Sequence, residues 1–109
     1  MLKDISGDGG LVKEILKKGK GKRPVGGSNC TIHYRATWQD GTVFESTIEQ
    51  REPLTFTLGE NLVIKAWEQG VPTMRIGEKC LLHVKPEYGY GEKGMPPKVP
   101  PNCPLIYEI

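Results

Sequence analysis

The stretch CTIHYRATWQDGTVFES, residues 30–46, decides the fold class. From Cys30 to Trp38 every second residue is apolar or aromatic, and polar residues stand between them. Successive side chains of a strand point to opposite faces of a sheet, so this alternation predicts one half-buried strand. The pair Asp40-Gly41 then predicts a tight turn into a second strand over 42–46. The buried face of the first strand is expected to carry Cys30, Ile32, Tyr34, Ala36 and Trp38.

Glycine and proline divide the rest of the chain into similarly short pieces. Further strands are expected at 11–16, 54–58, 80–84 and 105–109. The only convincing helix is predicted at 62–71, because Val63, Ala66, Trp67 and Gly70 share one side of it and Pro72 follows. The segment 87–104 carries five prolines and three glycines, so it is predicted to be irregular and functional. We therefore predict an α+β fold, an antiparallel sheet covered by one short helix.

The length and net charge of the chain restrict the class of protein to which it can belong. With 109 residues we predict one domain over 11–109 and an N-terminal extension over 1–10. A net charge of +2 indicates neither a nucleic-acid nor a membrane partner, and we interpret the basic cluster at 17–23 as a solvated loop. No apolar run approaches the ~20 residues of a membrane span. Three scattered cysteines, Cys30, Cys80 and Cys103, are expected to be reduced, free and mostly buried, so a cytoplasmic location is predicted.

Two short motifs invite site predictions that their context excludes. Residues 89–94 satisfy the G-x-G-x-x-G fingerprint, but the prolines that follow prevent the helix that a dinucleotide-binding turn needs. The pairs Cys30/His33 and Cys80/His83 repeat a C-x-x-H spacing, yet residues three apart on a strand face opposite ways. We therefore expect no metal and no cofactor. The chain also lacks a local nucleophile motif of the hydrolases.

The remaining signal is a concentration of aromatic residues at strand ends and in loops. Trp67 lies on the predicted helix and Tyr90 in the long irregular segment. Because binding sites concentrate on loops held by a rigid scaffold, these two positions indicate a pocket between the helix and the loop.

Several sequence motifs resemble those of FKBP-type peptidyl-prolyl cis/trans isomerases, the tacrolimus- and rapamycin-binding immunophilins. They follow one another along the chain in the same order as in that family. They are VIKAW at 63–67, LG at 58–59, HY at 33–34, DGT at 40–42, FES at 44–46 and PEYGYG at 86–91. The resemblance is strongest to the first FKBP domain of the larger TPR-containing co-chaperone immunophilins. It implies a curved antiparallel β-sheet wrapped around one short α-helix, with a last strand that is truncated here. It also implies binding of proline-containing polypeptides and macrolides, and a heat-shock chaperone partner reached through a domain not in this chain.

The resemblance assigns an aromatic pocket to matching positions of this sequence. Trp67 is implied as its floor, and the Ile64 N–H and the Tyr90 hydroxyl as donors to carbonyl groups of the bound peptide or drug. Phe44 and Glu45 complete the implied catalytic set. The whole implied pocket comprises Tyr34, Phe44, Glu45, Phe56, Val63, Ile64, Trp67, Tyr90, Val99 and Tyr107.

Four positions differ from the pattern usual in that family. Glu45 stands in place of Asp, Gln50 or its neighbour Arg51 in place of Arg, Leu54 in place of Phe, and Tyr107 where Phe is frequent. An alternative hypothesis is therefore a catalytically weak proline-binding or regulatory module of a co-chaperone. A direct isomerisation assay separates the two hypotheses.

Overall fold

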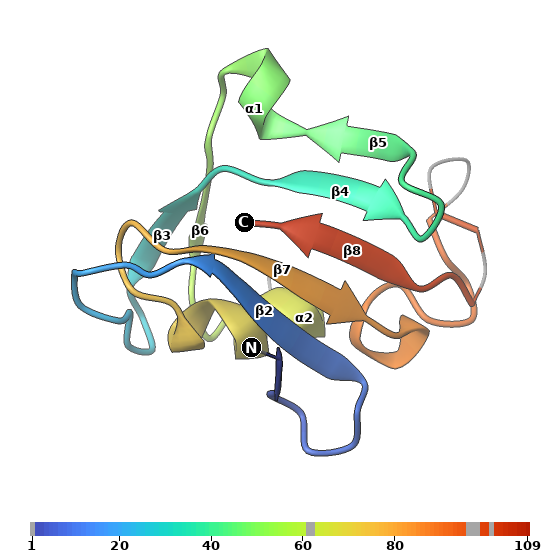
Figure 1. Cartoon of the computed structure of the whole chain (residues 1–109), viewed down its shortest axis with the longest axis horizontal. Helices are drawn as coiled ribbons and strands as arrows, with labels where there is room; N and C mark the ends of the chain where they lie inside the picture. The colour runs from blue at the N-terminus through green and yellow to red at the C-terminus, as the bar shows by residue number, and fades with distance from the viewer. Residues whose placement is uncertain (1, 61–62, 96–98, 101) are drawn as a thin grey trace.

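The computed structural model describes residues 2–60, 63–95, 99–100 and 102–109. Within them, an antiparallel six-stranded sheet has the order β1-β2-β7-β8-β4-β5 (Figure 1). A second, two-stranded sheet pairs β3 with β6. The strands are β1 Leu2–Asp4, β2 Leu11–Lys17, β3 Asn29–Ile32, β4 Arg35–Trp38, β5 Val43–Ser46, β6 Leu54–Thr57, β7 Lys79–Val84 and β8 Leu105–Glu108. The predicted α+β class is confirmed.

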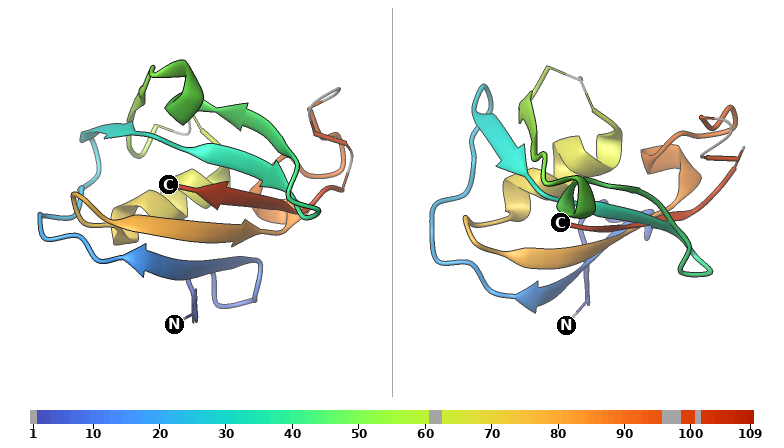
Figure 2. Two further views of the ribbon diagram at one scale, coloured as in Figure 1. Left: turned by 45° about the horizontal axis from the view of Figure 1, so that its top comes forward. Right: turned by 90° about the horizontal axis from the view of Figure 1, so that it is seen from above.

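The helical elements are short. They are α1 Thr47–Gln50, α2 Lys65–Gly70 and two 3₁₀ turns, η1 Val71–Thr73 and η2 Pro86–Tyr88. Figure 2 shows α2 on one side of the curved six-stranded sheet, with β3 and β6 beyond the end of that sheet. Among the described residues, no helix is long and apolar enough to cross a membrane.

The core lies between α2 and the sheet. Ala66 and Trp67 of α2 are buried against strand residues such as Leu82, which is fully buried. Gly70 allows the close approach of helix and sheet, because a Cβ there would lie 2.9 Å from Leu82 Cδ1. A side chain at this position would push the helix away from β7.

The predicted single strand over 30–38 is wrong in one respect, because the structure divides it into β3 and β4, in different sheets. The division falls at Tyr34, whose N–H donates to Thr47 Oγ1 at 2.8 Å and whose carbonyl accepts from Thr47 N at 3.0 Å. Thr47 thus satisfies the backbone of Tyr34 where a strand partner would otherwise do so. The prediction that alternate side chains of this segment face the core is confirmed, since Cys30, Tyr34 and Ala36 are buried while Thr31 is exposed.

The helix prediction needs two corrections. Helix α2 covers Lys65–Gly70, and Pro72 does not end a helix but lies in the first turn of η1, where its missing N–H is not needed. Helix α1, a single turn, was not predicted. Ser46 caps it by accepting from Ile48 N at 3.2 Å. Leu62, which the prediction included, lies outside the described residues.

The segment before β2 is structured, although no element was predicted for it. Strand β1 pairs with β2, and the loop between them closes around Asp8. The Asp8 carboxylate accepts from the Ser6 hydroxyl at 2.6 Å, the Gly10 N–H at 2.8 Å and the Tyr88 hydroxyl at 2.8 Å. These hydrogen bonds, that from Ser6 foremost, lower the pKa of Asp8 to about 2.

The described residues of the long segment after β7 are irregular, as predicted, apart from η2 and one isolated bridge. Met95 and Val99 exchange backbone hydrogen bonds of 2.7 and 3.0 Å. Gly94 allows the close approach of the backbone to Val99, because its φ is +64° and a Cβ there would lie 2.4 Å from the Val99 carbonyl oxygen. Pro96, Pro97, Lys98 and Pro101 lie outside the described residues.

Candidate functional site

Trp67 is the centre of an aromatic cluster between α2 and the sheet. Its ring centroid lies 4.7 Å from that of Tyr34, 5.5 Å from that of Tyr107 and 6.0 Å from that of Phe56. The Tyr34 and Tyr107 rings meet Trp67 edge to face, at 69° and 81°, an arrangement that aromatic quadrupoles favour. Three rings, from β6, β8 and the link between β3 and β4, thus converge on the indole of α2, and Trp67 is only 5% exposed.

A bulge in β5 brings two consecutive residues to the concave side of the sheet. Ala36 pairs with Glu45 and Thr37 with Val43, so Phe44 is the extra residue between them. A regular strand would point Phe44 and Glu45 to opposite faces, but a bulge changes this alternation. The Phe44 ring stacks on Trp38 at 6.1 Å and packs against the core. Glu45, opposite the buried Ala36, reaches Tyr34.

The Tyr34 hydroxyl donates a hydrogen bond to Glu45 Oε1. Burial raises the pKa of Tyr34 well above its ordinary value, and the bond to the Glu45 carboxylate raises it further. The phenol therefore stays protonated and remains a donor at every physiological pH. A carboxylate is consequently held beside the aromatic cluster by a buried partner.

Two further phenols, those of Tyr90 and Tyr107, contribute hydroxyl groups to the candidate site, and the pKa of each responds to the other. Burial is the first cause that raises the pKa of both phenols, and the Glu45 carboxylate also disfavours their ionisation. Tyr107 is 2% exposed and lies on β8, between Leu82 of β7 and Ala36 of β4.

The other residues that the resemblance assigned also pack into the same core. Val99 is 1% exposed, and Val63 and Ile64 are half-buried against the buried cluster. Ile64 is the N-cap of α2, and its carbonyl accepts from Trp67 N at 3.0 Å. In the described part of the chain, neither the Ile64 N–H nor the buried indole N–H of Trp67 has a hydrogen-bond acceptor. Tyr107 of β8 contacts Trp67 of the helix, and its pKa is also raised by Tyr90 of the long loop.

Sequence reasoning left Trp38 and Leu54 out of the assigned set. Trp38 stacks on Phe44, and Leu54 is half-buried against the core. The alternation that placed Trp38 on the same face as Tyr34 already contained this signal. The bulge that brings Phe44 to the same face has no comparable pattern in the sequence.

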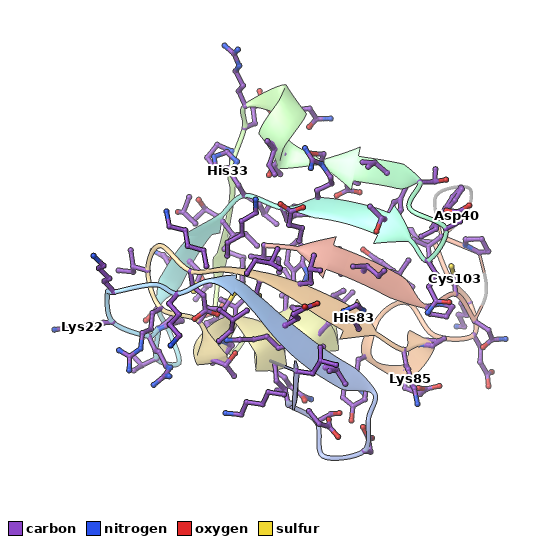
Figure 3. All side chains as sticks on the ribbon, in the orientation of Figure 1. Lys22, His33, Asp40, His83, Lys85 and Cys103 are labelled. Atoms are coloured by element: carbon purple, nitrogen blue, oxygen red, sulfur yellow. The ribbon has the colours of Figure 1, made fainter. Side chains whose placement is uncertain are left out.

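The cysteines and histidines do not approach one another. Cys80 is fully buried, and burial raises the pKa of its thiol to about 12, whereas His83 lies on the other face of β7. Cys30 is buried and His33 exposed. Figure 3 shows the two histidines well apart, His33 near α1 and His83 on β7. All three cysteines are free, as predicted, with Cys103 half-buried. No group of three or more metal-ligating side chains occurs among the described residues.

A groove of about 760 Å³ lies elsewhere, beside β3 and the ends of β7 and β8. Its apolar lining includes Ile32, Met74 and Ile109, and none of the ten assigned residues contributes to it. The aromatic cluster, which combines apolar walls with convergent donors, is therefore the stronger candidate site.

This fold, an antiparallel sheet around one short helix with aromatic residues between them, defines a class of domain that solved structures contain. The N-terminal domain of FKBP42 from Arabidopsis thaliana superimposes with a TM-score of 0.89 and 34% identity, over 99% of this chain and 87% of that one. Residues 20–109 match the family of FKBP-type peptidyl-prolyl cis-trans isomerases. The chain belongs to this family of enzymes.

Individual relatives agree with this assignment. FK506-binding protein 59 of Drosophila melanogaster is 48% identical over 97% of this chain and 24% of its own length. Peptidyl-prolyl cis-trans isomerase FKBP4 of Mus musculus is 43% identical over 94% of this chain and 22% of its own. The chain spans about a quarter of the length of these two relatives. FK506-binding protein 1A of Aspergillus fumigatus is 43% identical, over 92% of this chain and 90% of its own length.

Proposed function

We propose that this chain catalyses cis/trans isomerisation of X-Pro bonds at the aromatic cluster around Trp67, and that the proline ring lies against the indole. The convergence of Tyr34, Phe56 and Tyr107 on this one ring is the observation that carries the proposal. Membership of the isomerase family supports it. Catalysis is assigned to Trp67, Phe44, Glu45, Ile64 and Tyr90, with the other five assigned residues as pocket walls.

The reaction needs no nucleophile and no general base. Rotation about the X-Pro bond has a barrier of ~18–20 kcal/mol but breaks no covalent bond. The twisted amide loses resonance, so its carbonyl is less dipolar than in the planar ground state. An apolar aromatic wall tolerates the twisted form better than the planar forms, and tighter binding of the twisted form accelerates the reaction.

Two donors hold the substrate chain in this proposal. The Ile64 N–H stands at the start of α2, and its carbonyl is already engaged by the helix. The Tyr90 hydroxyl keeps its own proton because burial, and then the Glu45 carboxylate, raise its pKa. Each donor would bind a carbonyl group of the peptide and so fix the geometry on both sides of the rotating bond.

The same cluster is proposed to bind the macrolides tacrolimus and rapamycin, with Glu45 accepting a ligand hydroxyl. The name of the Drosophila relative refers to FK506, which is tacrolimus. We propose a cytoplasmic location and a co-chaperone role, with a heat-shock chaperone bound by a domain outside these 109 residues. The length of the Drosophila and mouse relatives supports this last proposal.

A protease-free isomerisation assay on a short X-Pro peptide tests the reaction. Wild type should accelerate the exchange, Trp67→Leu should lose most of the acceleration, and Tyr88→Phe should retain it, because Tyr88 bonds Asp8 away from the cluster. A wild type that binds the peptide without accelerating exchange would establish the catalytically weak module instead.

Tryptophan fluorescence tests the macrolide proposal. In Trp38→Phe the only remaining tryptophan is Trp67, so its emission should change and saturate on titration with tacrolimus. An emission that stays constant while calorimetry records binding would place the drug away from the indole.

A further inference from the structure

Phe44 lies at a point of β5 where strand pairing does not fix its side chain. It is the extra residue of the bulge, so it has no partner in the register of β4. A bulge changes the direction of a side chain and locally disrupts the pairing of the strand. The residue before it, Val43, is 47% exposed, so the chain on that side of Phe44 is not anchored in the core. The orientation of the Phe44 ring therefore depends on the contacts of its side chain.

Trp38 provides a rigid surface for this ring. Its residue pairs with the buried Leu105 of β8, the strand next to β4. In the turn that leads to β5, the Trp38 N–H donates to the Thr42 carbonyl and the Trp38 carbonyl accepts from the Gly41 N–H, both at 3.0 Å. The rings of Trp38 and Phe44 stack with their centroids 6.1 Å apart and their planes at 21°. Within the part of the chain that the structure describes, no other aromatic ring stacks on Phe44.

We propose that Trp38 is a positioning residue for the isomerisation: its indole stacks on Phe44 and holds that ring in place as a wall of the pocket. This inference rests on the proposed function. An offset-stacked aromatic pair is stabilised beyond the area that it buries, and this stabilisation depends on the geometry of the two rings. Trp38 therefore favours one orientation of Phe44. A wall that is ordered before the substrate arrives loses no further side-chain freedom on binding.

A double-mutant cycle tests the inference, with kcat/KM measured in the protease-free peptide assay. Trp38→Leu should lower kcat/KM about three- to tenfold, within the range that one aromatic pair accounts for. In a Phe44→Leu background the same substitution should change kcat/KM by less than about twofold, because the ring that Trp38 positions is gone. Trp38→Phe keeps a flat ring and should stay within about twofold of wild type. Val43→Ala, which shortens an exposed side chain in the same bulge, should leave kcat/KM unchanged.

A spectroscopic measurement separates positioning from a general loss of structure. The chain has two phenylalanines, Phe44 and Phe56, and Phe56 contacts Trp67. With ¹³C-labelled phenylalanine, the order parameter of the Phe44 ring should fall in Trp38→Leu, while that of Phe56 stays constant and shows that the core is intact. Trp38→Met, a second variant without a flat ring, should reproduce both results.

The possible outcomes distinguish this inference from the proposed function. With an active wild type, an unaffected kcat/KM or an unchanged Phe44 order parameter in both Trp38→Leu and Trp38→Met overturns this inference alone. An equal loss of kcat/KM in both Phe44 backgrounds also overturns it, since the effect would then be structural. A loss in Trp38→Phe as large as that in Trp38→Leu would exclude stacking as the cause. An inactive wild type overturns the proposed function and this inference with it.

Discussion

Replacement of Lys13 by Met should strongly destabilise the fold, because Lys13 is a buried charge with a single buried counter-charge. Its Nζ lies 2.6 Å from Glu78 Oε2, and the two side chains are 4% and 5% exposed. Nζ also donates to the carbonyl and the hydroxyl of Thr73, both at 3.1 Å. Lys13→Met leaves the Glu78 carboxylate unpaired in the interior, which costs ~3–5 kcal/mol. That is a large share of the ~5–15 kcal/mol by which a domain is stable.

Urea unfolding measures this loss directly. With m near ~1–3 kcal/mol/M, the midpoint should fall by at least about 1 M. Lys79→Met is the matched control. The Lys79 side chain is 54% exposed, and its Nζ lies 3.0 Å from Glu108 Oε2. An ion pair that is exposed to this extent contributes only ~0–1 kcal/mol. Adding Glu78→Gln to Lys13→Met should recover part of the loss, since the interior then holds no unpaired charge. Equal midpoints for Lys13→Met and Lys79→Met would refute this reasoning.

Three further predictions concern the site and its surroundings. The Asp8 carboxyl should titrate with a midpoint of about 2 when it is followed by NMR. Its pKa in the folded protein is lowered from 3.8, so its contribution to stability is present above pH 3.8 and is lost as the pH falls through 2. Tyr88→Phe should raise that midpoint, and an unchanged value would contradict the assigned bond. Cys103 should be alkylated under native conditions well before Cys80, whose burial raises its pKa to about 12; mass spectrometry identifies the modified thiol. Glu45→Asp with Gln50→Arg should raise tacrolimus affinity, measured by calorimetry, more than the isomerisation rate, because the apolar wall and two donors carry the rate. Affinity that stays equal or falls would count against this role of Glu45.

Most strands, and the facing of residues 30–38, could be predicted because they depend on local alternation. The buried positions Tyr34 and Ala36 follow directly from it, and β6 and β7 begin and end within one residue of their predicted bounds, whereas β1 was not predicted. The division of the long strand at Tyr34 could not be predicted, because it depends on Thr47, thirteen residues away. Helix α1 carries a signal that was overlooked: Ser46, with Glu49 three residues later, fits a capping box.

The candidate site, like the fold, could be predicted only where it depends on local sequence. The aromatic residues around Trp67 were assigned through motifs, and the structure brings them together. The bulge at Phe44 depends on pairing across the sheet, so it does not follow from the local sequence. The role of each side chain in the reaction stays a prediction until the assays above are done.

The place of β8 in the sheet has a consequence for synthesis. Residues 105–108 form the last strand of the sequence, yet they lie between β7 and β4 in the sheet. On the ribosome, the nascent chain therefore cannot close the sheet until these residues have left the exit tunnel, and β7 and β4 present open edges until then. The strand that carries Tyr107 completes the sheet, so the proposed site arises in the same step as the finished fold.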